Sequence, residues 1–299
     1  MKIATILSRY LILVLILSIS NLASGQNKPL NLKYLGVAGW EISNDSTVVL
    51  IDPYISRPNL SELKKSDVVF SDSLMIDKVI GKVDFILVTH SHLDHLLDVG
   101  YIAKKTGAKV IGTQTSINII RAYNIDEDQL YIVAGGEDYQ FKNISVKVMP
   151  SLHSALRGKH FFDDRTHDEP LTYPLKDGDF VMGGSLMFLL RIGNSEVLAM
   201  GSMNFIENEI KGLSPDILLA GVNGSRYEIY NYSERLLKLT NYPKIILPTH
   251  WDRYEPYDDV EAHEKARRDK VEPFVKEVYE ISTEVQVIVP VHLKTITIK

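Results

Sequence analysis

The chain has 299 residues, a formal net charge of −5 at pH 7 and 45% hydrophobic residues. This length and composition suffice for an ordinary buried core in a single domain, and the mildly acidic balance argues against nucleic acid or an anionic membrane as the main partner. The sequence contains no cysteine, which excludes disulfides as a source of stability.

The first 25 residues have the pattern of a signal peptide. Lys2 and Arg9 give a basic start, residues 10–19 are mostly apolar, and small side chains precede Gln26. Because a membrane span needs about 20 apolar residues, this stretch favours a cleaved leader over a lasting anchor. We therefore expect an exported protein, periplasmic or secreted, whose mature domain spans 26–299 and has no stable membrane association.

Short apolar segments open the mature chain. Residues 32–36, 40–42 and 47–51 are expected to form strands, and Asp52-Pro53 ends the third of them. Residues 84–89 are again short, apolar and β-branched, which is typical of a strand buried on both faces.

Four ionisable side chains follow this buried strand where it should end: His90, His92, Asp94 and His95. Burying such groups beside a sheet is costly unless a cation pairs with them. In extended backbone His90 and His92 project to the same side, whereas Asp94 and His95 can face a second point nearby. Imidazole nitrogen and carboxylate oxygen are ligands that zinc prefers. A His-rich surface turn is the alternative, but this spacing at a strand end favours a metal site.

The His90-x-His92-x-Asp94-His95 pattern resembles the signature of the metallo-β-lactamase superfamily. The resemblance extends from about Leu32 to the C-terminus and implies an α/β fold, the αββα four-layer sandwich. The opening segment Leu35–Ile42, followed by Ile51-Asp52-Pro53, is similar to the branch that includes the L-ascorbate-6-phosphate lactonases. That resemblance implies that Asp52 lies near the metal centre. Relatives in that branch often carry histidine where this chain has Val37.

Two further histidines fit the same resemblance. His153 follows an alternating strand expected over 144–149, and the family places a ligand at such a position. His250 ends an apolar strand at 244–249 and corresponds to the family's last ligand. Without the signature at residues 90–95, either histidine would more often be structural.

Ser202 marks a departure from the family. Most members have Gly-Asp-Thr where this chain has Gly201-Ser202, and their aspartate bridges two metals. This departure leaves three arrangements open. The site could hold one metal only, Asn204 or Glu207 could take the place of the bridging aspartate, or two metals could bind without a bridge. The third arrangement is that of a β-lactamase subclass with serine here. It would give His90, His92 and His153 to the first metal, and Asp94, His95 and His250 to a weaker second one.

The long polar segment 157–178 is either a solvated insertion or a lid that carries specificity, and its place after His153 favours the lid. His160 and His167 are candidates for contact with substrate. Gly135-Gly136 predicts a hairpin. Other expected elements are helices over 96–105, 115–123 (with Thr113 or Thr115 as N-cap), 231–240 and 259–280 (kinked by Pro273), and closing strands over 284–290 and 295–298.

The resemblance implies a zinc-dependent hydrolase, in which a metal-bound hydroxide attacks a small-molecule substrate while Asp94 orients it and transfers its proton. Manganese or iron also suits such ligands. The lactonase-like opening favours a cyclic ester (lactone) or a phosphodiester. A β-lactamase-type amide hydrolase and a metal-binding protein without catalysis are the alternatives.

The leader yields the first test. N-terminal mass analysis of the natively exported protein should give a mature chain that begins near Gln26, because the small residues before it suit a signal peptidase. A mature chain that retains residues 1–25 would contradict this expectation.

Overall fold

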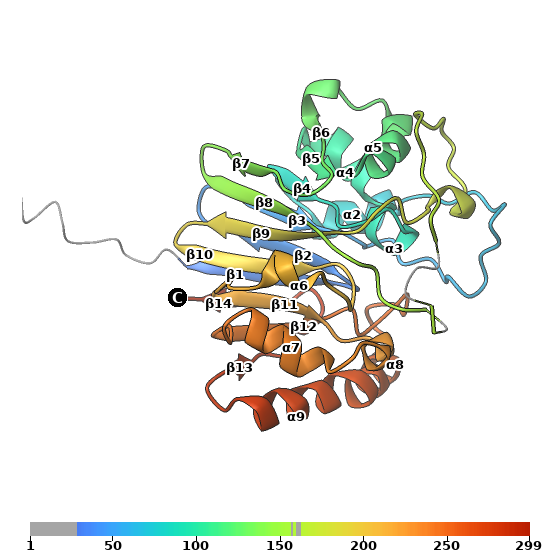
Figure 1. The fold of residues 1–299 in the computed structure, drawn as a ribbon. Helices are drawn as coiled ribbons and strands as arrows, with labels where there is room; N and C mark the ends of the chain where they lie inside the picture. Colours follow the sequence, from blue (N-terminus) through green and yellow to red (C-terminus); the bar gives the residue numbers. More distant parts are fainter. Residues whose placement is uncertain (1–28, 157, 160–162) are drawn as a thin grey trace, which may run out of the picture.

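The computed structural model describes residues 29–156, 158–159 and 163–299. The expected leader and His160 lie outside the described residues. Two seven-stranded sheets pack face to face, and helices cover their outer surfaces (Figure 1). This is the αββα sandwich expected from the sequence.

The first sheet is antiparallel in its first half and parallel in its second. In spatial order it contains β14 (Thr295–Ile298), β1 (Leu30–Gly36), β2 (Gly39–Ser43), β3 (Val48–Ile51), β4 (Phe85–Leu87), β5 (Lys109–Gly112) and β6 (Leu130–Ile132). The strands from β3 to β6 run parallel, so the ends of β3 and β4 meet at one edge of the sheet.

The second sheet has the same division. In spatial order it contains β13 (Gln286–Val287), β12 (Ile245–Thr249), β11 (Ile217–Gly221), β10 (Ser195–Met200), β9 (Leu186–Ile192), β8 (Ile144–Pro150) and β7 (Asp138–Gln140). The strands from β13 to β10 are parallel, and those from β10 to β7 are antiparallel.

Helices form the outer layers. The first sheet is covered by α2 (Ser73–Val79), α3 (Leu93–Leu96), α4 (Val99–Thr106) and α5 (Gln114–Ile120). Beside the second sheet lie α6 (Glu207–Ile210), α7 (Tyr232–Leu239), α8 (Val260–Ala266) and α9 (Glu272–Ile281). No helix among the described residues is long and apolar enough to span a bilayer.

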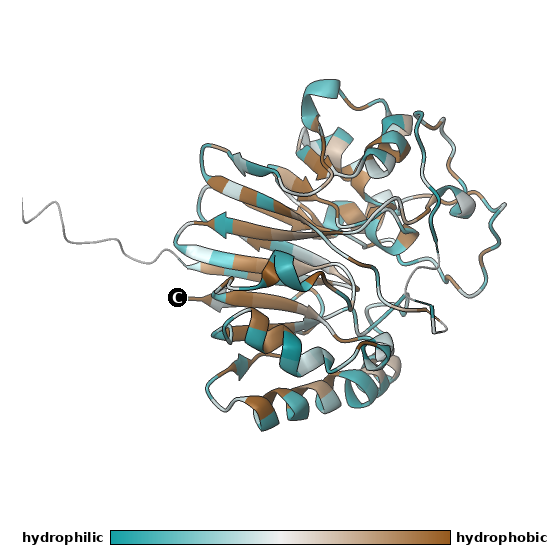
Figure 2. Ribbon diagram, viewed as in Figure 1, coloured by the Kyte–Doolittle hydropathy of each residue, from teal (hydrophilic) through white to brown (hydrophobic). Residues whose placement is uncertain are grey.

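Side-chain alternation along β4 explains why this strand is apolar on both faces. Phe85 and Leu87 enter the core between the two sheets, whereas Ile86 and Val88 pack under the helices of the outer layer. Figure 2 shows mostly apolar residues along the strands and a mixture of polar and apolar residues along the helices. The strand therefore brings His90, three residues after its end, to the rim of the sandwich.

Three expectations need correction. Gly135-Gly136 forms no hairpin, because β6 lies in the first sheet and β7 in the second; both glycines have positive φ and turn the chain across the sandwich edge. The expected helix 259–280 is present as a continuous helical run, but it contains a π-helical segment, Arg267–Val271, just before Pro273, which cannot donate a backbone hydrogen bond and lies in the first turn of α9. The strand expected over 284–290 is only β13, at the edge of the second sheet.

Candidate metal centre

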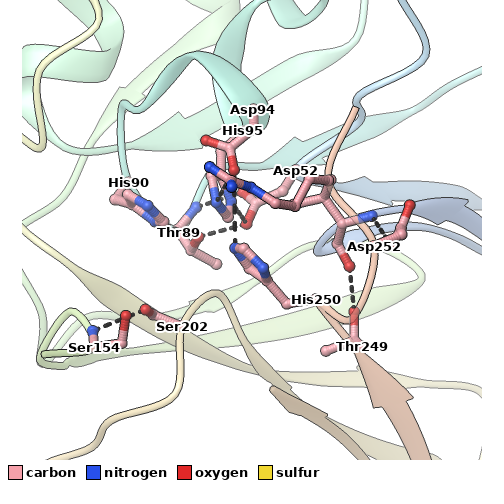
Figure 3. Close-up of polar contacts among 12 residues, drawn as sticks. Asp52, Thr89, His90, Asp94, His95, Ser154, Ser202, Thr249, His250 and Asp252 are labelled. Carbon is pink, nitrogen blue, oxygen red and sulfur yellow. Dashed lines mark hydrogen bonds and ion pairs between the residues drawn. The ribbon is translucent and has the colours of Figure 1, made fainter. Parts of the chain in front are cut away.

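Six histidine and aspartate side chains meet at the rim of the sandwich. Figure 3 labels His90, Asp94, His95 and His250 among them. The structure divides the six side chains into two groups, and within each group the potential ligand atoms lie within 4.8 Å of one another: His90, His92 and His153 in one, and Asp94, His95 and His250 in the other. The two groups have the same members as the third of the arrangements considered for Ser202, and their role as metal ligands stays a prediction.

Asp52 connects the ends of two neighbouring strands to one of these groups. Its carboxylate accepts hydrogen bonds from the backbone N–H of Thr89, at 2.7 Å, and from the Thr89 hydroxyl. Its Oδ2 also lies 2.8 Å from Nδ1 of His95. Because an ionised carboxylate only accepts, Nδ1 of His95 carries the proton and Nε2 presents its lone pair. Asp52 therefore lies beside the site, as the resemblance implied.

The partners of His90 and His153 fix their tautomers in the same way. The Thr89 hydroxyl proton goes to Asp52, so its oxygen accepts from Nδ1 of His90, 3.1 Å away. Nδ1 of His153 donates to the carbonyl oxygen of Ser154 at 3.0 Å. Nε2 of His90 is buried without a hydrogen-bond partner. A buried acceptor of this kind, beside other nitrogen ligands, fits a metal ion.

The electrostatics keep His90, His92, Asp94, His153 and His250 in the protonation states that metal binding requires, whereas Asp94 and Asp52 raise the pKa of His95. Burial lowers the pKa of His92, His153 and His250 to about 4, and the pKa of His90 falls well below 6.5 for the same reason. Burial alone would raise the pKa of Asp94, but the facing histidines hold it at about 2. At neutral pH these groups are therefore neutral imidazoles and an ionised carboxylate.

Ser202 and Asn204 support His153 from both sides. The Ser202 hydroxyl, at the position of the family's bridging aspartate, accepts a 2.9 Å hydrogen bond from the backbone N–H of Ser154. The side-chain amide of Asn204 donates to the carbonyl oxygen of His153 at 3.2 Å. Both side chains are buried. In this structure they fix the backbone around His153.

A fully buried carboxylate, Asp252, supports the segment that carries His250. It accepts from the backbone N–H of Val37 at 2.9 Å and from Nε2 of His292 at 2.9 Å, and it forms an ion pair with Arg57. The backbone N–H of His250 and the side-chain hydroxyl of Thr249 both donate to the carbonyl oxygen of Val37. His250 and Val37 both have positive φ, a conformation that such residues rarely adopt. The hydrogen bonds of Asp252, His250 and Thr249 to the backbone of Val37 hold this conformation in place.

Sequence reasoning missed the groups that hold the ligands. Nothing in the sequence pattern marks Thr89, Arg57 or His292, and Asp252 is distinguished only by its place two residues after His250. It also missed Asp163, whose carboxylate lies 3.7 Å from Nε2 of His92. The substrate contact expected of His167 stays a prediction. In the structure its ring lies against the Asp179 carbonyl, and its backbone is bonded to α5.

Comparisons with a family model and with related proteins agree on the family of this chain. A model described as a beta-lactamase superfamily domain matches residues 31–250. A protein of Caldivirga maquilingensis named a metal-dependent hydrolase is 28% identical over 227 residues, which are 75% of this chain and 82% of that protein. A protein of Carboxydothermus hydrogenoformans with the same name is 24% identical over 228 residues, 75% of this chain and 86% of that one.

Solved structures agree on the fold. A metallo hydrolase from Ignicoccus hospitalis superposes with a TM-score of 0.60 at 18% identity, covering 91% of this chain and 99% of that one. A metallo-beta-lactamase fold protein from Bacillus subtilis gives a TM-score of 0.55 at 12% identity, covering 90% and 99%. The fold and rim site thus define the metallo-β-lactamase class. The chain belongs to the beta-lactamase superfamily domain family within it.

The depressed histidine pKa values predict how the metal-free protein responds to acid. For His92, His153 and His250 the pKa is about 4 in the folded protein and about 6.5 when unfolded. Between these values the unfolded chain binds more protons, so acidification favours unfolding.

Chelator-treated protein should therefore have a lower urea midpoint at pH 5 than at pH 7. Asp94 and Asp52 raise the pKa of His95 against the effect of burial, and this single group opposes the trend without reversing it. A urea midpoint that stays constant or rises at pH 5 would contradict the lowered pKa values of His92, His153 and His250.

Proposed function

We propose that this protein is an exported, zinc-dependent hydrolase with two metal sites at the rim of the sandwich. The coarser statement, a metal-dependent hydrolase of the metallo-β-lactamase superfamily, is what its family and its relatives share. The observation that carries the finer proposal is the pair of three-residue groups, one of three imidazoles and one of a carboxylate and two imidazoles. Both sets suit zinc, although manganese or iron can occupy similar sites.

The chain's own residues have distinct tasks in this proposal. When bound, the metals supply a Lewis acid and an acidified water. Asp94 is ionised, and its Oδ2 lies 3.7 Å from His95 Nε2 and 3.9 Å from His250 Nε2. Its side chain is 22% exposed, more than that of His95 or His250, so its carboxylate can reach both the second site and the rim. We assign it the role of orienting the attacking water and transferring a proton to the leaving group.

For the substrate we propose a small cyclic ester or phosphodiester. The sequence Leu35–Ile42, similar to that of the lactonase-like branch, supports this choice. In the structure this segment supplies the Val37 carbonyl that holds His250, so the family-like opening is part of the site. Serine at position 202 instead favours the β-lactamase alternative, because a β-lactamase subclass shares it.

Metal titration by calorimetry tests the ligand sets. The wild type should bind two zinc ions with unequal affinity, because Ser202 adds no bridging negative charge between them. His153→Ala should remove the tighter step and His250→Ala the weaker one, since each site loses one of three protein ligands.

His263→Ala is the matched control. This histidine lies outside both groups and bonds to the carbonyl oxygen of Pro256, so its loss should leave both binding steps unchanged. Unchanged binding in both His153→Ala and His250→Ala would refute the ligand sets, and two equal steps in the wild type would refute the asymmetry.

A substrate panel tests the reaction. Lactones, an aryl ester, a bis-aryl phosphodiester and a chromogenic β-lactam should be compared with the zinc-loaded and the chelated protein. We expect zinc-dependent hydrolysis of a lactone or phosphodiester, and a loss of at least about 100-fold in Asp94→Asn, the typical contribution of a positioned acid–base group. Preferential β-lactam turnover would establish the alternative, and inactivity towards all substrates would favour a binding protein.

A further inference from the structure

The segment after His153 carries a buried carboxylate that the ligand sets do not include. Asp163 is only 7% exposed, although its neighbours Asp164 and Arg165 are exposed. Its Oδ1 accepts from Nε and the backbone N–H of Arg165, at 2.8 and 3.2 Å. Its Oδ2 accepts from Nη2 of Arg165 at 2.9 Å and from the backbone N–H of Met182 at 3.2 Å. Four donors thus fix the position of this carboxylate.

This carboxylate faces the first group of ligands. Its Oδ2 lies 3.7 Å from Nε2 of His92. The backbone N–H of Met182 donates to Asp163, and its carbonyl accepts from the backbone N–H of Ser91, next to His92. The backbone of Met182 therefore connects Asp163 to the backbone that carries His92.

The other histidines show what a carboxylate at this position does. His95 donates from Nδ1 to Asp52, and His153 donates from Nδ1 to a backbone carbonyl, so Nε2 is left for a metal. Such acceptors set the tautomer and raise the ligand's basicity. In His92 the nitrogen that faces the carboxylate is Nε2, whereas in His95 and His153 the nitrogen that donates is Nδ1.

We propose that Asp163 is a positioning residue that accepts the Nε2 proton of His92 and thereby presents Nδ1 to the first metal. The proposal rests on the metal sites proposed above. A hydrogen bond requires about 3 Å, so the proposal requires that the His92 ring and the Asp163 carboxylate move closer than 3.7 Å when the metal binds. Asp163 thus contributes to metal retention, and Arg165 holds its carboxylate in place.

Calorimetric zinc titration of the full chain tests this role. Asp163→Asn keeps the size of the side chain but removes its charge and one acceptor. We expect the affinity of the first site to fall about 10- to 100-fold, the range for loss of such a partner, while the second site keeps its wild-type affinity. Asp164→Asn is the matched control: it removes the same charge one residue later, from an exposed side chain, and should titrate like the wild type.

A spectroscopic readout separates this role from simple docking of the segment. In zinc-loaded protein labelled with ¹⁵N-histidine, long-range ¹H–¹⁵N correlation should show His92 metallated at Nδ1 and protonated at Nε2. In Asp163→Asn the Nε2–H resonance should shift or exchange faster. Arg165→Gln, which weakens docking but keeps the carboxylate, should reduce first-site affinity less than Asp163→Asn does.

The outcomes are distinguishable. A wild type that binds no zinc would overturn the proposed function together with this inference. A wild type that binds two zinc ions, while Asp163→Asn retains both affinities or His92 is metallated at Nε2, would overturn the inference alone. A larger loss in Arg165→Gln than in Asp163→Asn would also overturn it, because the effect would then come from docking.

Discussion

The site depends on buried carboxylates, Asp52 and Asp252, that fix the positions of the histidines through hydrogen bonds to their rings or to the neighbouring backbone. Asp52 joins the end of β3 to the end of β4 and orients His95, while Asp252 joins the segment of His250 to the turn at Val37. Burial alone would raise the pKa of Asp252, but Arg57 and His292 hold it well below its usual range. Removing one partner of such a buried pair costs about 3–5 kcal/mol. These anions therefore couple the stability of the fold to the geometry of the ligands.

The two groups of candidate ligands could be found from the sequence because they lie near strand ends. The spacing from His90 to His95 indicates a metal site directly, whereas His153 and His250 were found through the family resemblance. Asp252 could not be predicted, because its partners are distant in the chain: its carboxylate meets groups 195 and 215 positions away. Asp163 could not be predicted either, because His92, which it faces, lies far from it in the sequence. A single sequence does not record such pairs.

The fold was predictable to a similar depth. Alternating and apolar runs located most strands, but not the sheet to which each belongs, so Gly135-Gly136 was interpreted as a hairpin. Local capping was more reliable, since Thr113, one of two expected caps, accepts the backbone N–H of Ser116 at the start of α5. Short-range geometry is set by neighbouring residues, whereas strand order follows from how the whole core packs.

The pairing of β1 with β14 has a practical consequence. Leu30 lies opposite Ile298, so the two ends of the described chain leave the fold together. Both strands reach this point at the edge away from the ends of β3 and β4, because β1 runs parallel to β3 and β14 runs against β1. A tether or fusion partner at either end would therefore project away from the rim that carries the histidines. The protein could be immobilised through either terminus with that rim still facing solution.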